Sequence, residues 1–479
     1  MAELALTEAL TLLAFLILPC LAVMLVVSQL LDAKKPGTRS IKIGTALIFG
    51  PLMTAPALVT ANAIGLRIST SSALTGLFII ALAIYLPTWL AGGKNRVGHS
   101  EKRSTAQLPI LISERTDRMV IAIMFGLIVL RLASILPDLL LRPVFPWDAW
   151  KTWVWKARAW FEIGEIISFA NAREWLSAPA NVHIVEGTNH PDTISLVMLW
   201  SALALGRWDD SLLGLPWIMC TIGTMLSIYG ALRSQGLPPV LALIGPYLFV
   251  SLPMIATHTA LYGYADLWMA ALFAVLTVGI LQQQMTGGLF GLHLIGASMI
   301  FMAFVKDTGS YWIPIIIAAL LANALPNRWL FRLGLIGSGI GLSLLALGMD
   351  PIAWLTQERF HLDPQSVTAV FSGIARHLLL WHDWHLLGYL LPFIFLAAAL
   401  VGTQSQPIRS LLILVLMCLA GLLVAFTFSR AGQYAIIGTL FSRMFMHLVP
   451  AVIILSTLTA WEWKLAATKG NKECTGPFL

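Results

Sequence analysis

The feature that most limits how this chain can fold is a succession of apolar runs, most of them long enough to cross a membrane, that recurs along most of its length. In lipid, an apolar run of about 20 residues satisfies its backbone hydrogen bonds only as a helix. Hydrophobic residues make up 58% of the 479 residues and charged residues only 11%, which lies outside the range of soluble proteins. We therefore predict an all-α polytopic membrane protein.

The distribution of basic residues predicts the orientation of the chain, because Lys and Arg collect in cytoplasmic loops. The net charge of +7 is spread over short loops, which indicates membrane topology rather than binding to nucleic acid. With the basic loops in the cytoplasm, the sequence predicts about thirteen crossings, an extracytoplasmic N-terminus and a cytoplasmic C-terminus. The first eight residues contain no Lys or Arg and so do not resemble the basic start of a signal peptide.

One apolar run is too short for this pattern. It covers residues 193–206, which are fewer than a hydrocarbon core of roughly 30 Å requires for a comfortable crossing. We interpret this run as a re-entrant or surface helix on the extracytoplasmic side. That choice keeps Arg233, Arg328 and the basic C-terminal tail on the cytoplasmic side.

The predicted crossings and loops divide the chain into five parts. These are N-terminal transmembrane helices (residues 1–141), an extracytoplasmic loop with interfacial helices (142–192), core transmembrane helices (193–349), a second extracytoplasmic loop (350–385), and C-terminal transmembrane helices with a cytoplasmic tail (386–479). The four cysteines lie far apart along the chain, so the sequence indicates neither a disulfide framework nor a zinc site.

Residues 145–161, called the tryptophan segment below, differ from the apolar runs around them. They contain five tryptophans, three cations and a single carboxylate, Asp148. An α-helical period places Trp147, Trp150, Val154, Ala157 and Phe161 on one face, as expected of a helix that lies in the membrane interface. Two interpretations remain open. The segment is an aromatic anchor with snorkelling cations, or Asp148 is a catalytic carboxylate held at the membrane surface.

Ionisable residues are rare elsewhere in the chain, and those near the membrane surface are candidates for function. Structural alternatives exist for each. Asp266 begins an apolar run and is also suited to capping a helix, and His190-Pro191-Asp192 is also typical of a turn before a helix. Arg443 and His447 are one helical turn apart and could form an interfacial anchor pair. The His382–His385 cluster matches no metal-ligand spacing and is interpreted as a solvated loop.

Six short motifs together resemble the GT-C superfamily of membrane glycosyltransferases, in particular the bacterial branch of protein mannosyltransferases and aminoarabinose transferases. The matching residues are Pro146-Trp147-Asp148-Ala149-Trp150, Lys156-Ala157-Arg158, His190-Pro191-Asp192, Gly263-Tyr264-Ala265-Asp266, Lys306-Asp307-Thr308-Gly309, and Ser442-Arg443 with His447 and Pro450. The resemblance implies a GT-C-like bundle whose first large outer loop carries the catalytic acid, here Asp148. It also implies a polyprenyl-phosphate sugar as donor and transfer outside the cytoplasm. Two departures are the three crossings that precede the one leading into this loop and the lack of an acidic residue adjacent to Asp148.

We accordingly expect an inverting glycosyltransferase of the inner membrane whose active site faces away from the cytoplasm. Asp148 is the expected general base, and Lys156, Arg158 or Arg443 would bind the lipid phosphate. The remaining expected substrate-binding residues are Lys151, His190, Asp192, Tyr264, Asp266, Lys306 and His447. The expected partners are the lipid-linked donor, membrane lipid and a glycan, lipid or protein acceptor. No metal ligand is predicted, and the need for a divalent cation stays open. The alternative is a transporter or flippase for an anionic lipid or solute.

Overall fold

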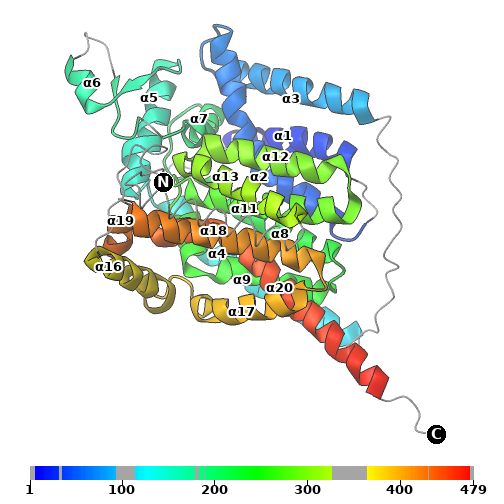
Figure 1. Cartoon of the computed structure of the whole chain (residues 1–479). Helices are drawn as coiled ribbons and strands as arrows, with labels where there is room; N and C mark the ends of the chain where they lie inside the picture. Colours follow the sequence, from blue (N-terminus) through cyan, green and yellow to red (C-terminus); the bar gives the residue numbers. More distant parts are fainter. Residues whose placement is uncertain are drawn as a thin grey trace. The chain divides into compact units, whose positions relative to one another are not determined.

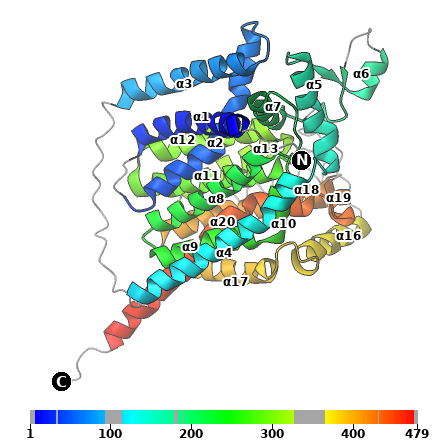
Figure 2. The same cartoon turned by 180° about the vertical axis from the view of Figure 1, so that it is seen from behind.

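A computed structural model describes residues 6–31, 35–92, 114–177, 183–188, 190–325, 364–429 and 431–474. Within these ranges the chain is helical almost throughout, which confirms the all-α class (Figures 1 and 2). The predicted crossing at residues 333–348 and part of the predicted second loop, residues 350–363, lie outside the described residues. The basic residues between 93 and 113, together with Arg328, Arg332 and Arg430, also lie outside them.

The chain divides into two compact units, which are described separately. Unit 1 comprises Met1–Ser251 and Ile255–Ser310, and unit 2 comprises Leu252–Met254 and Tyr311–Leu479. The helices that begin in unit 1 are α1 (Leu6–Leu30), α2 (Thr38–Ala63), α3 (Thr70–Gly92), α4 (Glu114–Leu141), η1 (Ala149–Val154), α5 (Trp155–Ile163), α6 (Ala172–Ser177), α7 (Thr193–Leu205), α8 (Leu215–Ser234), α9 (Pro239–Ser251), α11 (Asp266–Thr286), α12 (Leu289–Val305) and α13 (Asp307–Ala324), which continues into unit 2. Two short strands, β1 (Phe169–Ala170) and β2 (His183–Ile184), pair in parallel.

The helices of unit 2, after the end of α13, follow the undescribed residues 326–363. They are α16 (Pro364–Ala375), η2 (Arg376–Leu380), α17 (Leu387–Gly402), α18 (Gln406–Phe428), α19 (Ala431–Ile437) and α20 (Phe441–Cys474). Part of the predicted second loop is therefore helical. Helix α10 (Pro253–Ala260) begins in unit 2 and continues in unit 1.

Helix α11 forms the centre of unit 1, and every residue from Asp266 to Gln282 is buried. It packs against α8 and α12, beside which it lies in Figures 1 and 2. Small residues allow the backbones of α11 and α12 to approach closely, since a Cβ atom added at Gly291 would lie 2.6 Å from the carbonyl oxygen of Gly279. By contrast, only 11% of the apolar stretch of α4 is buried, as expected of a helix that faces lipid.

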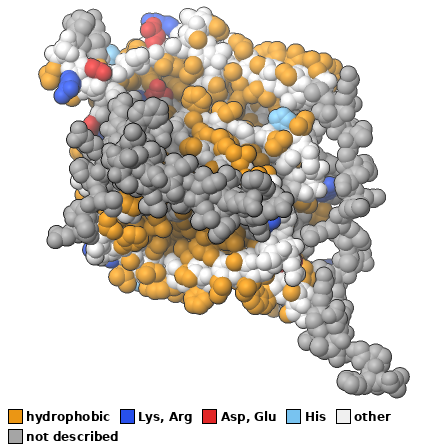
Figure 3. Space-filling view, in the orientation of Figure 1, with side chains coloured by type: hydrophobic (Ala, Val, Ile, Leu, Met, Phe, Trp, Pro, Cys, Tyr) orange, Lys and Arg blue, Asp and Glu red, His pale blue; other side chains and the backbone are white. Residues whose placement is uncertain are grey.

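Eight helices in the described part of the chain are long and apolar enough to cross a membrane, or nine if α9 and α10 form one bent span. The protein is therefore a multi-pass membrane protein, and about thirteen crossings stays a prediction. Hydrophobic side chains cover broad areas of the face shown in Figure 3, whereas acidic side chains gather near α5 and α6. Cys20, Cys220 and Cys418 are free and buried.

Helix α7 corresponds to the apolar run that the sequence marks as too short to cross. It has 13 residues, and all of them are buried, because α1, α2 and α5 pack around it. The short length agrees with the prediction, its complete burial in the protein was not predicted, and the re-entrant or membrane-surface position stays a prediction.

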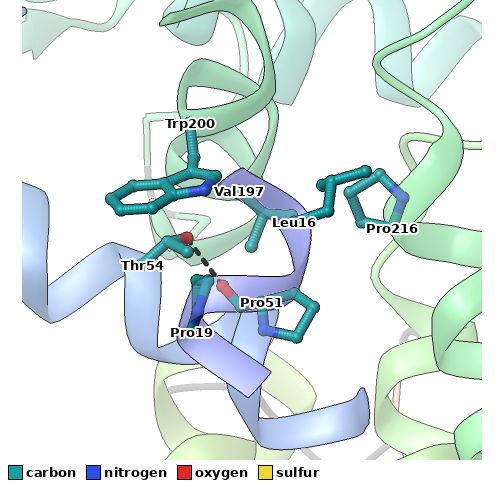
Figure 4. A pocket seen from close by; sticks show the side chains of 7 residues that line it. All are labelled: Leu16, Pro19, Pro51, Thr54, Val197, Trp200 and Pro216. Atoms are coloured by element: carbon teal, nitrogen blue, oxygen red, sulfur yellow. Dashed lines mark hydrogen bonds between the residues drawn. The ribbon is translucent and has the colours of Figure 1, made fainter. Parts of the chain in front are cut away.

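A narrow apolar gap without enclosed room for a water molecule remains where α7 packs against α1, α2 and α8. Its lining is Leu16, Pro19, Pro51, Thr54, Val197, Trp200 and Pro216 (Figure 4). The hydroxyl of Thr54 donates to the Pro51 carbonyl at 2.6 Å, and the indole of Trp200 donates to the Phe15 carbonyl at 2.8 Å. The polar groups at this packing defect are thus satisfied within the helices.

The sequence predicts one crossing at residues 237–255, but the structure divides it into α9 and α10, which are bent by 63° at Leu252. Pro253 lacks the backbone N–H that a continuous helix needs, which accounts for the break. At the end of α9 the carbonyl of Val250 accepts a hydrogen bond from the guanidinium of Arg131 at 3.3 Å. The cation inside the predicted fourth crossing therefore has a backbone partner.

Candidate functional site

The tryptophan segment is helical, but its first part is a π-helix. The π-helical η1 covers Ala149–Val154 and leads directly into α5. Hydrogen bonds in a π-helix join residues five apart, so the side chains shift relative to an α-helical register, and such turns are frequent at functional sites. The segment therefore does not present the face that an α-helical period predicts.

The exposed residues of the tryptophan segment are Phe145, Trp147, Trp150, Trp155 and Arg158. Trp150 and Trp155, five residues apart, are exposed to similar extents, 48% and 51%. Val154 and Ala157, expected on the aromatic face, are buried. The predicted face is thus wrong, because an α-helical period does not hold through the π-helix.

Asp148 is half-buried and immediately precedes η1. Behind it, Ala149 is fully buried and lies against Gly263, in the loop between α10 and α11. A Cβ atom at Gly263 would lie 2.7 Å from the Cβ atom of Ala149. Gly263 also has a φ of +96°, a backbone angle that residues with a side chain rarely adopt. The glycine therefore lets the loop that contains Tyr264 and leads into α11 approach the helix that follows Asp148.

Lys156 is buried, with 3% of its side chain exposed. Its ammonium donates to the carboxylate of Asp192 at 2.8 Å and to the carbonyl of His190 at 3.0 Å. These contacts fix the chain that leads into α7 against α5. A phosphate could reach Lys156 only by displacing Asp192.

His190 connects this contact to the junction of α12 and α13. Its Nδ1 lies 3.5 Å from a carboxylate oxygen of Asp307, and its ring lies 5.2 Å from that of Trp153. Burial alone would raise the pKa of Asp307, but the interaction with His190 and the positive charge of Lys306 outweigh it and leave this pKa below its ordinary value.

The neighbouring Lys306 forms a buried ion pair with Asp266, the first residue of α11. The exposed fractions of the two side chains are 4% and 0%. Two charges removed from water to this extent require a partner, because desolvation would otherwise shift or neutralise them. The pair joins the end of α12 to the start of α11.

These contacts form one connected group, called the charged cluster below. Its members are Lys156, Asp192, His190, Asp307, Lys306 and Asp266. The three carboxylates lie at the N-termini of α7, α11 and α13, where the helix dipole favours negative charge. Five members were expected site residues. Asp307, the sixth, belongs to a resembling motif but was not among them, and only its contact with His190 reveals its place.

Lys151 and Arg158 are more accessible. The ammonium of Lys151 lies 2.8 Å from Glu186, whose side chain is 68% exposed, and 5.5 Å above the ring centre of Trp147. The guanidinium of Arg158 lies 6.0 Å from the ring centre of Trp208 and makes no ion pair with any residue that the structure describes. The sequence reasoning missed Glu186 and Trp208, because neither lies in a motif that resembles a known family.

Tyr264 lies in the same unit as the charged cluster. Its ring centre is 5.3 Å from that of His258, a residue that is only 4% exposed and belongs to α10. Its carbonyl accepts a hydrogen bond from the indole of Trp217 at 3.0 Å. The start of α11 is thus held by aromatic contacts to α8 and α10.

Arg443 and His447 belong to unit 2, where both lie on α20. Arg443 is half-buried, and His447 is fully buried with its Nδ1 accepting a hydrogen bond from the indole of Trp312 at 3.0 Å. The interfacial anchor interpretation therefore does not fit His447. The site described here consists of residues of unit 1 alone.

The predicted solvated loop at residues 382–385 is partly ordered by unit 2. His382 and His385 are exposed and have positive φ angles, but Trp384 is buried. The hydroxyl of Ser442 donates to the carboxylate of Asp383 at 2.6 Å and also contacts Nδ1 of the buried His377 at 2.9 Å. In the described ranges, no group of three or more His, Cys, Asp or Glu side chains is arranged to hold a metal ion.

No family model matches this chain, and neither the curated proteins nor the solved structures contain a match to it.

Proposed function

We propose that the protein is a membrane glycosyltransferase of the GT-C type, which moves a sugar from a polyprenyl-phosphate donor to a hydroxyl acceptor. The observation that supports this proposal best is the position of Asp148. This half-buried carboxylate begins a π-helix that the charged cluster and Gly263 fix in place, in a chain that is otherwise largely apolar. A carboxylate placed at the edge of such a bundle is suited to taking a proton from a hydroxyl.

The reaction is a single displacement with inversion. The acceptor oxygen attacks the anomeric carbon of the donor sugar while the bond from this carbon to the phosphate oxygen breaks. The polyprenyl phosphate leaves with the bonding electrons, and the acceptor proton passes to the carboxylate of Asp148. This role requires Asp148 to be ionised before the reaction.

Lys151 is the cation that we assign to the donor phosphate. It lies three residues after Asp148, and its contact with the exposed Glu186 is the kind of surface ion pair that contributes only about 0–1 kcal/mol. A phosphate can therefore replace Glu186 at little cost. Lys156 and Lys306 are less suited, because each is buried in an ion pair with a carboxylate.

The charged cluster has a supporting role in this proposal. Its ion pairs connect α5, the start of α7, the start of α11 and the junction of α12 with α13. They hold the elements around Asp148 in a fixed geometry, as a catalytic group requires.

A second candidate function is the transport of an anionic lipid or solute. The bend of 63° between α9 and α10 favours it, since broken helices line the binding sites of many transporters. The buried His258 lies after this break, in the last turn of α10. The position of the charged cluster at helix ends favours chemistry over transport.

One experiment distinguishes the two functions. Purified full-length protein in liposomes is supplied with polyprenyl-phosphate hexoses and with acceptor glycans and lipids, and both sugar transfer and solute movement are measured. The glycosyltransferase proposal expects transfer with release of polyprenyl phosphate. Movement of the intact donor or solute without cleavage of the sugar–phosphate bond would instead establish transport.

The same preparation tests the role of Lys151. A lost charged hydrogen bond costs about 1.5–3 kcal/mol, so Lys151→Ala should weaken donor binding by roughly ten- to a hundredfold. The matched control is Lys464→Ala, which removes an exposed lysine of α20 in unit 2. Equal donor affinities for the two variants would remove Lys151 from the site.

A further inference from the structure

An open hollow lies beside the exposed side of the tryptophan segment, and neither Asp148 nor the charged cluster lines it. It has a volume of about 320 Å³, including its open mouth. The lining residues, which define the tryptophan hollow, are Val144, Trp150, Val154, Trp155, Arg158, Trp208 and Asp210. Its enclosed part is far smaller than the roughly 300–1,000 Å³ of enclosed small-molecule sites, so a ligand would lie in the open mouth, against the aromatic side chains, rather than inside a cavity.

Of the aromatic walls of the tryptophan hollow, Trp208 is held in place by its neighbours. The indole of Trp208 donates to the carboxylate of Asp210 at 2.6 Å, and its ring packs 6.2 Å from that of Phe161. The ring of Trp150 packs on that of Trp147, with ring centres 5.6 Å apart, and both rings are exposed. Rings that are fixed before binding lose little conformational freedom when a ligand stacks on them.

The charged residues of the lining decide which ligand fits. Arg158 and Asp210 carry opposite charges, so the tryptophan hollow is neutral in sum. A phosphate or carboxylate would meet Arg158 but would also be repelled by Asp210. A neutral ligand with several hydroxyl groups can instead accept hydrogen bonds from the guanidinium and donate them to the carboxylate.

We propose that the tryptophan hollow binds one neutral pyranose ring, stacked on its indole walls and oriented by Arg158 and Asp210. The apolar C–H face of such a ring packs on tryptophan, while its hydroxyl groups meet the two charged side chains. Because Trp150 belongs to the π-helix that follows Asp148, the ring is the acceptor sugar. Its role as acceptor rests on the proposed function, whereas its binding does not.

A membrane anchor is the competing explanation for exposed tryptophans. An anchor needs a convex apolar surface that enters lipid. The tryptophan hollow is concave and includes the carboxylate of Asp210, which lipid would exclude. These two properties favour a sugar over the membrane.

Binding is tested with full-length protein in nanodiscs by saturation-transfer NMR, using neutral methyl pyranosides (gluco, galacto and manno) and methyl glucuronide as an anionic comparison. At least one neutral pyranoside should bind in a saturable manner, and more tightly than the glucuronide. Trp150→Ala and Arg158→Ala should each weaken binding by about tenfold. The matched control is Trp175→Ala on α6, because Trp175 and Trp150 are both 48% exposed and only Trp150 lines the tryptophan hollow.

The proposal is overturned if no neutral pyranoside binds, if the glucuronide binds more tightly, or if Trp175→Ala weakens binding as much as Trp150→Ala.

A second measurement tests directly whether the tryptophan hollow lies in lipid or in water. A nitroxide is attached to Trp155→Cys in a Cys474→Ser background, which leaves Cys20, Cys220 and Cys418, all buried. The label should be relaxed more strongly by a water-soluble nickel complex than by oxygen, and the reverse would place the tryptophan hollow in lipid and overturn the proposal. Sugar binding without transfer activity would overturn the proposed function alone.

Discussion

Replacing Lys306 by methionine would remove the cation that pairs with Asp266, while keeping a side chain of similar length. Both side chains are almost fully buried, so the carboxylate would stay in an environment that disfavours its charge. Breaking a buried ion pair by removing one partner typically costs about 3–5 kcal/mol of folding free energy. We expect Lys306→Met to fall in this range.

A comparison with a surface pair isolates the contribution of burial. Arg142 lies 3.0 Å from Asp138 on α4, and their side chains are 61% and 46% exposed. An exposed pair of this kind contributes at most about 1 kcal/mol. Arg142→Met therefore removes a cation from an ion pair in the same unit at a much smaller expected cost.

The free energy of unfolding is measured by SDS titration of the purified protein in mixed micelles, with helix content as the readout. The double variant Asp266→Asn/Lys306→Met removes both charges and should recover much of the stability that Lys306→Met loses. If Lys306→Met costs no more than Arg142→Met, the pair is not buried as the structure has it. The charged cluster would then not hold α11 against α12.

Two further predictions follow from the geometry of unit 1, and a third follows from the distribution of basic residues. Gly263→Ala should destabilise the protein by about 1–3 kcal/mol in the same titration, because its φ is +96° and its Cβ would meet Ala149, whereas an unchanged midpoint would contradict this close approach. Asp307 has a lowered pKa in the folded protein, so its contribution to stability is present above its ordinary pKa of 3.8 and is lost as the pH falls through the folded value. Asp307→Asn should therefore cost more stability at pH 7 than under strong acid. An equal cost at both pH values would count against the contact between Asp307 and His190. A reporter fused after Arg233 should lie in the cytoplasm and one fused after Ala265 outside it, and the opposite signals would refute the predicted orientation.

The positions of the long helices could be predicted from the sequence, because membrane-length apolar runs are visible without any tertiary information. The run predicted at residues 119–141 lies within α4, and the run at residues 411–428 lies within α18. The short run at residues 193–206 was also recognised, but not its burial, because the packing partners of a helix do not follow from its length.

Two local features could not be derived from an α-helical period. The π-helix of the tryptophan segment shifts the side-chain register and exposes Trp150 while burying Ala157. The break between α9 and α10 follows from Pro253, which lies inside a run that reads as a single crossing. Proline was visible in the sequence, whereas the π-helix has no comparable single-residue signal.

The candidate site was predictable in its residue types but not in its pairing. Lys156 and Asp192 are 36 residues apart, and Lys306 and Asp266 are 40 residues apart. A hydrophobic period indicates which face of a helix is buried, but it does not indicate which helix ends meet. Only the structure shows that the buried lysines have carboxylate partners, which makes Lys151 and Arg158 the accessible cations of the tryptophan segment.

The most direct test of the account is the transfer activity of Asp148→Asn. Asparagine keeps the shape of the side chain and caps a helix about as well as aspartate, but it cannot accept the acceptor proton. Loss of a general base typically lowers the rate by about 10²–10⁴-fold. The matched control is Asp138→Asn, which changes an exposed carboxylate of α4.

Sugar transfer from a polyprenyl-phosphate donor is measured with purified, folded protein of both variants and the wild type. The account predicts a loss of at least about a hundredfold for Asp148→Asn and near wild-type transfer for Asp138→Asn. Transfer by Asp148→Asn within about threefold of the wild type, less than removal of a general base would cost, would contradict it.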